Sequence, residues 1–232
     1  MRNSPNAFGG TTTDSGLAAH MRKVYAYMTA GLGLTGIIAA WLMGTPDVLA
    51  AFAGSMWFWV AIIAELALVF GISFAIMRLS GGVALMLFLL YSALNGLTIA
   101  PLVYMYTAES VASVFFVTSG MFAALSFYGF VTKRDLSAMG KFLFMALIGL
   151  LIVMVMNIFI ASSMLSLLIS AAAVLIFAGL TVYDTQKIKE IYGQVAGDAE
   201  NTHRAAVMGA LTLYLDFINM FIHLLRLFGT RK

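Results

Sequence analysis

Apolar residues fall in long runs that are almost free of charge and are separated by short polar segments. A helix needs about 20 residues to cross a hydrocarbon core of roughly 30 Å. Seven runs are long enough, and backbone groups cannot stay unpaired in lipid, so each run predicts a transmembrane helix. The predicted spans are residues 24–43, 55–77, 83–105, 110–131, 142–161, 164–183 and 205–228.

Composition agrees with this pattern. Of the 232 residues, 62% are apolar and only 10% are charged, whereas soluble domains carry about 25% charged residues. The mean hydropathy is +0.98. We therefore expect an all-α integral membrane protein with one domain, residues 24–229. A flexible polar tail, residues 1–23, is expected before it and a short tail, residues 230–232, after it.

The distribution of charge predicts an orientation. Ten of the 13 Lys and Arg residues lie in the N-terminal tail or in loops on its side of the membrane, and three lie on the opposite side. The positive-inside rule then places the N-terminus in the cytoplasm and the C-terminus outside. The basic residues form no concentrated patch, so we expect no nucleic-acid partner. The absence of cysteine excludes disulfides, thiolate metal sites and cysteine nucleophiles.

Three acids lie within the predicted spans or at their ends: Glu65, Asp184 and Asp216. A carboxylate at the bilayer centre costs about 2.5–3.5 kcal/mol, so it normally faces protein, water or a partner. Asp184 and Asp216 are on consecutive antiparallel spans and are symmetric about residue 200. If the hairpin tip lies at that point, the two acids are level. If it lies near residue 197, they are offset by roughly 9 Å at 1.5 Å per residue.

A meeting of Asp184 and Asp216 would have chemical consequences. Two adjacent carboxylates in a low dielectric cannot both stay charged, so the pair holds one proton more tightly and titrates as a unit. The same oxygens suit a hard cation such as Ca²⁺, although two acids are too few for a closed site. A proton-sensitive latch with a transient Ca²⁺ site is one interpretation. A hydrogen-bonded structural pair, or an Asp184 that reaches the interface, is the alternative.

Other polar residues extend this candidate site. Arg78 ends the second span on the side where Asp184 is expected, so it either pairs with an acid or anchors the interface. Asn219 is three residues from Asp216 and shares its helix face. Asn95 lies one and a half turns before Pro101, where it can satisfy carbonyls that the proline frees.

Four segments resemble one known family. LYLDFINMFIHLLRLFG at 213–229 and VYDTQKI at 182–188 are similar to motifs of the Bax inhibitor-1 family, also called the transmembrane Bax-inhibitor-motif or lifeguard family. ALNGLTIAP at 93–101 and AELALVF at 64–70 resemble its third and second spans. The resemblance covers residues 20–229 and is closest to bacterial members, which implies the bacterial inner membrane as location.

The resemblance implies a fold and an activity. The expected fold has six helices around a central, C-terminal seventh helix. Family members are linked to pH-dependent calcium leak and, in eukaryotes, to suppression of cell death. The family's paired aspartates fall on Asp184 and Asp216, its span-two acid on Glu65, and its latch arginine on Arg78.

Enzymatic alternatives lack required motifs. Tyr183–Asp184 resembles one half of an intramembrane aspartyl protease, but no glycine precedes Asp216 as the GxGD half requires. Zinc-protease, rhomboid and retinal-pump motifs are also missing. We therefore expect no enzyme and no cofactor, but a pH-sensitive leak pathway with Ca²⁺ as the transported ion and protons as the signal. A regulator that binds another membrane protein, such as a quality-control protease, is the alternative.

Overall fold

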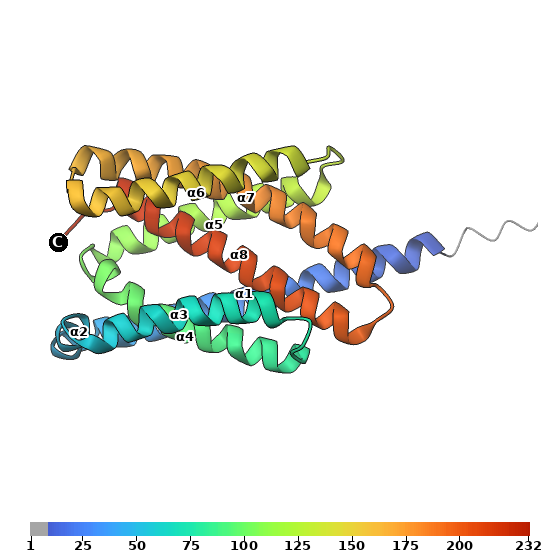
Figure 1. The fold of residues 1–232 in the computed structure, drawn as a ribbon, viewed down its shortest axis with the longest axis horizontal. Coiled ribbons are helices and arrows are strands. Elements are labelled where there is room, and N and C mark those ends of the chain that lie inside the picture. Colours follow the sequence, from blue (N-terminus) through green and yellow to red (C-terminus); the bar gives the residue numbers. More distant parts are fainter. Residues whose placement is uncertain (1–8) are drawn as a thin grey trace, which may run out of the picture.

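The structure, a computed structural model, describes residues 9–232, with side chains from Ser15 onward. Within this range it contains helices and no β-strand; the chain runs as antiparallel hairpins along one long axis (Figure 1). The helices are α1 (Gly9–Met43), α2 (Pro46–Ala53), α3 (Met56–Ala75), α4 (Gly81–Tyr104), α5 (Ala108–Val131), α6 (Ser137–Ile160), α7 (Ser163–Val195) and α8 (Ala199–Phe228).

Seven of these helices are long and apolar enough to cross a membrane. The predictions of an all-α fold and of seven spans are therefore confirmed. The eighth helix, α2, was not predicted. It has 8 residues, begins with Pro46 in its first turn, and packs Leu49 against Leu42 and Ala100. It lies in the connection between the first two spans.

Two helix ends differ most from the prediction. Residues 9–23, expected as part of a flexible tail, continue α1, because Met21 and His20 are buried against the bundle. The remaining tail residues, 1–8, lie outside the described residues. Helix α7 continues to Val195 instead of ending at 183, because Ile188 on its inner face is still buried.

A tight turn joins α7 to α8 and fixes how the two helices face each other. Gly197 has a φ of 108°, a left-handed conformation that glycine adopts without steric cost. The next residue, Asp198, caps α8 by accepting hydrogen bonds from the backbone N–H groups of Glu200 and Asn201, which satisfies two otherwise unpaired donors. Residues 196–198 therefore form the connection between the two helices.

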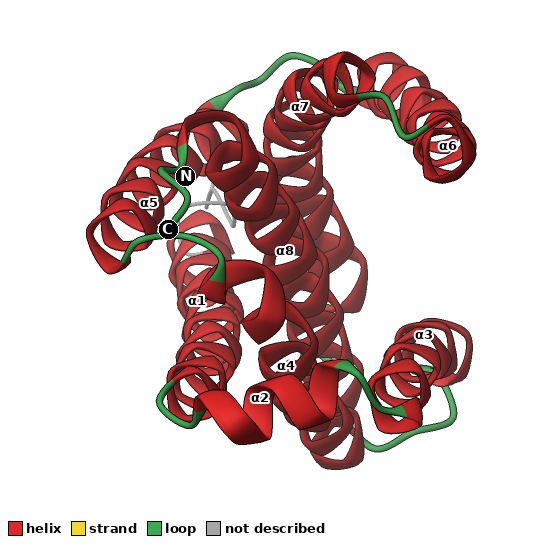
Figure 2. Cartoon of the chain, turned by 90° about the vertical axis from the view of Figure 1, so that its left-hand side faces the viewer, coloured by secondary structure: helices red, strands yellow, loops and turns green. Residues whose placement is uncertain are grey.

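Helix α8 is the most buried span. In its most apolar segment 67% of residues are buried, against at most 39% in the other spans. It packs against α1, α4, α5 and α7. Helices α3 and α6 pack instead on α4 and α7 and lie at the periphery in Figure 2. The predicted ring of six helices around the last one is therefore not confirmed.

Candidate functional site

Asp184 of α7 and Asp216 of α8 are neighbours inside the bundle and line the same cavity. Asp216 is 3% exposed, and its Oδ2 atom is buried without a hydrogen-bond partner among the described residues. The packing of Ile188 against Gly209 centres the hairpin between residues 198 and 199. The axial offset between the two aspartates is then about 4.5 Å at 1.5 Å per residue, which two side chains can bridge.

The aspartate pair lines a cavity of about 670 Å³. Because α3 and α6 do not pack against each other, the cavity lies between them, and α8 carries Asp216 and Asn219 into it. Its wall also holds Glu65 from α3 and Lys141 from α6. The cavity therefore brings together four residues of the predicted site: Glu65, Asp184, Asp216 and Asn219.

A second cavity, of about 320 Å³, continues from the pair toward the α7–α8 turn. Asp184 and Thr212 line both cavities. Met77 from the α3–α4 turn and Lys187 and Arg204 from α7 and α8 line the second one. Asp184 thus lies at the junction of two hollows that follow the α7–α8 hairpin, and Asp216 lines the first of them.

Glu65 belongs to a hydrogen-bonded network that crosses the bundle. Its carboxylate accepts hydrogen bonds from Thr98 Oγ1 at 2.6 Å and from Asn95 Nδ2 at 3.3 Å. Asn95 Oδ1 accepts from the Tyr214 hydroxyl at 3.0 Å, and this hydroxyl lies 2.6 Å from Thr35 Oγ1. Asn95 and Thr98 therefore bind Glu65, so the role predicted for Asn95 beside Pro101 is not the one observed. The network links α3, α4, α8 and α1.

Asn219 is on the cavity side of α8, one turn beyond Asp216. Its Nδ2 donates to the carbonyl oxygen of Leu215 at 2.8 Å. Its amide oxygen accepts no hydrogen bond from the described residues. Farther along α8, Met220, Phe221 and Leu224 are buried in the apolar core. Asn219 is the last residue of α8 that lines this cavity, and one turn farther on the buried His223 ring lies 3.3 Å from Ser170 Oγ.

Arg78 does not reach the aspartates. It is exposed on the turn after α3, and no ion pair joins it to an acid of the described residues. Its role as a latch stays a prediction.

Two residues of α8 that the sequence did not point to hold the α3–α4 turn. Arg204 Nε donates to the carbonyl oxygen of Leu79 at 2.8 Å, and Glu200 Oε1 accepts from the backbone N–H of Gly81 at 2.6 Å. The two side chains also pair with each other at 3.5 Å. The signal in the sequence was the i,i+4 Glu–Arg spacing, but its partner turn cannot be read from sequence.

The aspartate pair is not a closed metal centre. Within the described part of the chain, no three His, Asp or Glu side chains are grouped tightly enough to hold a metal ion. Calcium prefers six to eight oxygen ligands, so the carboxylate pair would need water or carbonyl oxygens as well. The arrangement suits a transient cation better than a resident one.

Comparison with known proteins decides the family. A family model described as "Inhibitor of apoptosis-promoting Bax1" matches residues 17–232. The chain belongs to this family. It is 47% identical over 220 residues to the inner membrane protein YbhL of Escherichia coli, with 94% of each chain covered. The predicted resemblance to a bacterial member of the Bax inhibitor-1 family is thus confirmed.

Other members of this family are similar along most of their length. An uncharacterized protein of Deinococcus radiodurans is 44% identical over 212 residues, covering 91% of this chain and 90% of that one. The protein RP147 of Rickettsia prowazekii is 40% identical over 223 residues, covering 95% and 93%. The chain is a multi-pass membrane protein whose relative YbhL is an inner membrane protein.

Proposed function

We propose that this Bax inhibitor-1 family protein is a pH-sensitive leak pathway for calcium, controlled by the proton shared between Asp184 and Asp216. The observation that carries the proposal is the position of the pair: both aspartates line one cavity, and Asp184 also lines the second. A buried, incompletely bonded carboxyl in a span is costly to maintain. Such a group is better explained by a role in ion passage than by packing.

The pair acts as the switch in this proposal. With one proton between them, Asp184 and Asp216 hold α7 and α8 together. Loss of that proton adds repulsion between two carboxylates in a low dielectric, and Ca²⁺ replaces the proton as the bridging cation. A tenfold change in proton activity is worth only about 1.4 kcal/mol. The closed conformation is therefore only slightly favoured over the open one near neutral pH.

The Arg204 and Glu200 contacts hold the closed state in this proposal. They fasten the α3–α4 turn to the start of α8, and this turn forms one wall of the second cavity through Met77. Helix α3 has few other attachments, because it packs only on α2 and α4. Release of the turn would widen the route from the aspartates to this end of the bundle.

The proposal assigns no catalytic residue and no resident cofactor. Calcium is its cargo, and protons are its signal. The orientation is the one predicted from charge, with the α7–α8 turn on the cytoplasmic side. The second cavity then opens toward the cytoplasm, and the packed part of α8 beyond Asn219 faces the exterior.

The test is calcium flux into dye-loaded liposomes that contain the purified full-length protein, measured from pH 6 to pH 8. We expect a leak above that of empty liposomes, rising as the pH increases. Flux equal to that of empty liposomes at every pH would contradict the proposal. It would favour the alternative, a regulator that acts by binding another membrane protein.

A further inference from the structure

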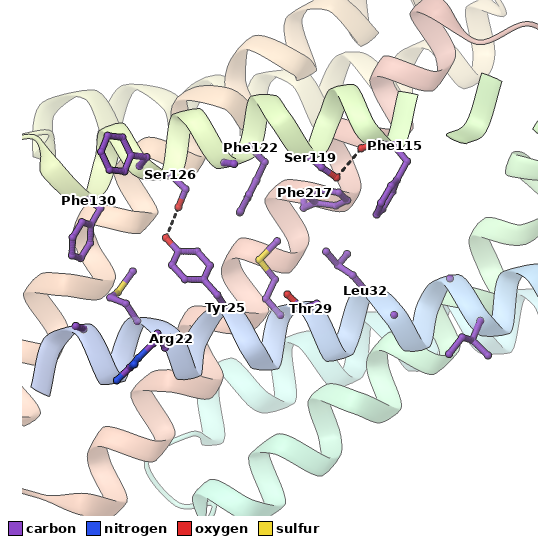
Figure 3. A pocket seen from close by; sticks show the side chains of 18 of the residues that line it. Arg22, Tyr25, Thr29, Leu32, Phe115, Ser119, Phe122, Ser126, Phe130 and Phe217 are labelled. Atoms are coloured by element: carbon purple, nitrogen blue, oxygen red, sulfur yellow. Dashed lines mark hydrogen bonds between the residues drawn. The ribbon is translucent and has the colours of Figure 1, made fainter. Parts of the chain in front are cut away.

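Another large hollow lies on the opposite side of α8 from the cavity that Asp184 and Asp216 line. It runs between α1 and α5, whose backbones stay apart, and has a volume of about 980 Å³. Figure 3 shows side chains of both helices pointing into it, including Leu32, Phe115 and Phe122, with Phe217 of α8 behind them. We name this space the α1–α5 groove.

The groove crosses the whole apolar thickness of the protein. Along α1 it extends from Ala18 to Ala40, about 33 Å at 1.5 Å per residue, which matches a hydrocarbon core of roughly 30 Å. An adjoining hollow of about 510 Å³ shares Leu32 and Phe217 with it and extends to Lys232. The two volumes lie in the range of pockets that enclose small molecules.

The lining is mostly apolar, with the hydroxyl groups of Tyr25, Thr29, Ser119 and Ser126 along it and cationic side chains at its ends. Arg22 of α1 is exposed and lines the end nearest the α7–α8 turn. Lys189 of α7 reaches this end as well, because its ammonium group donates to the Phe130 carbonyl oxygen. Lys232 lines the other end. No acidic side chain lines either hollow within the described residues, and no described acid forms an ion pair with Arg22.

From this charge pattern we propose that the α1–α5 groove binds an anionic phospholipid, with its phosphate at Arg22 and an acyl chain along Leu32 and Phe122. A guanidinium binds phosphate through paired hydrogen bonds, and basic pockets between spans are a known form of lipid recognition. An acyl chain reaches the bilayer middle, about 15 Å from the interface. That distance is about ten helical residues, the separation of Arg22 from Leu32.

The floor of the groove is already closed by protein. The Tyr25 hydroxyl lies 2.5 Å from Ser126 Oγ, and Ser126 in turn lies 2.9 Å from Thr185 Oγ1. The Tyr25–Ser126 contact joins the two walls in Figure 3. A bound chain would therefore rest on a fixed floor and leave the hydrogen bonds beneath it intact.

Two glycines allow the groove to be filled without disturbing the fold. A Cβ atom added at Gly33 or Gly36 has no atom within 4 Å, and both residues line the groove. Gly149 of α6 has equally open surroundings but lies away from the groove. Gly36→Leu is thus a filling variant, Gly33→Leu is a second one, and Gly149→Leu is the matched control.

The experiment is native mass spectrometry of the purified full-length protein with phosphatidylglycerol or phosphatidylcholine added in equal amounts. We expect more phosphatidylglycerol than phosphatidylcholine on the wild type and on Gly149→Leu, and loss of this adduct in both filling variants. Arg22→Gln should keep a lipid adduct but lower the headgroup preference about fivefold.

Three results would overturn the proposal. The first is equal retention of the two lipids by the wild type. The second is an undiminished adduct in folded Gly36→Leu and Gly33→Leu, with folding checked by circular dichroism. The third is a dimer that the filling variants abolish, because the groove's occupant would then be a second copy of the chain.

Discussion

The hydrogen bond between Thr98 and Glu65 offers a direct probe of how α3 is attached to the bundle. Thr98→Val removes the hydroxyl that lies 2.6 Å from Glu65 Oε1 and keeps nearly the same shape. Glu65 retains Asn95 Nδ2 as a donor at 3.3 Å, so its carboxylate loses one hydrogen bond and keeps the other. The cost should therefore be that of one hydrogen bond, without a full desolvation penalty.

The size of that cost reports the charge of Glu65. A hydrogen bond to a charged group contributes about 1.5–3 kcal/mol, and a neutral one about 0.5–1.5 kcal/mol. We expect Thr98→Val to lower the free energy of unfolding by about 2 kcal/mol if Glu65 is ionised. Thr29→Val is the matched control, because Thr29 is exposed on α1, and its change should stay within about 0.5 kcal/mol.

The assay is reversible unfolding in detergent micelles titrated with SDS, run as a double-mutant cycle with Glu65→Met. The cycle isolates the pairwise term, since both single variants remove the same interaction. A coupling energy of about 1.5 kcal/mol or more supports an ionised Glu65 that fastens α3 to α4. A coupling energy below about 0.3 kcal/mol would refute the reasoning, because the bond would contribute nothing.

Three further substitutions test separate parts of the structure. Arg204→Met removes the hydrogen bond from Arg204 to the Leu79 carbonyl oxygen, which contributes about 1 kcal/mol, and should therefore raise calcium flux by up to about fivefold. If Arg78→Met raises the flux more than Arg204→Met does, the latch is Arg78. Gly96→Ala places a Cβ 2.7 Å from the Thr35 carbonyl oxygen and should lower the free energy of unfolding in SDS by about 1–3 kcal/mol. The control is Gly82→Ala, in open space on the same helix, which should leave this free energy unchanged. Equal effects of the two substitutions would contradict the close α1–α4 crossing. Both ring nitrogens of His20 are buried without partners among the described residues. His20→Leu should therefore leave the free energy of unfolding unchanged or raise it by about 1 kcal/mol. A decrease of more than about 1 kcal/mol would mean that the ring has a polar partner.

Much of the fold followed from run length, because lipid admits few backbone arrangements. The helix ends that were missed lie where apolar and polar residues alternate. Residues 9–23 and 184–195 are too polar to look like spans, yet both continue helices. Buried residues such as Met21 and Ile188 lie on one face of these continuations. The short α2 was missed because its 8 residues are too few to stand out.

The candidate site was predictable only where the chain itself sets the geometry. Asp184 and Asp216 face each other across one hairpin, so counting from the turn sufficed to suggest their meeting. The hold of Arg204 on the α3–α4 turn joins residues 125 positions apart, which a single sequence does not reveal. The α1–α5 groove arises because two helices fail to pack, and no local pattern encodes that.

The central claim is that the proton shared by Asp184 and Asp216 controls ion passage. Its most direct test is calcium flux from pH 6 to pH 8 in liposomes that contain wild-type protein, Asp216→Asn or Asp47→Asn. Asp47 is an exposed acid in the first turn of α2, so its substitution controls for the loss of one charge. We predict that Asp47→Asn keeps the wild-type pH dependence, whereas Asp216→Asn flattens it. Identical pH profiles for all three proteins would contradict the account.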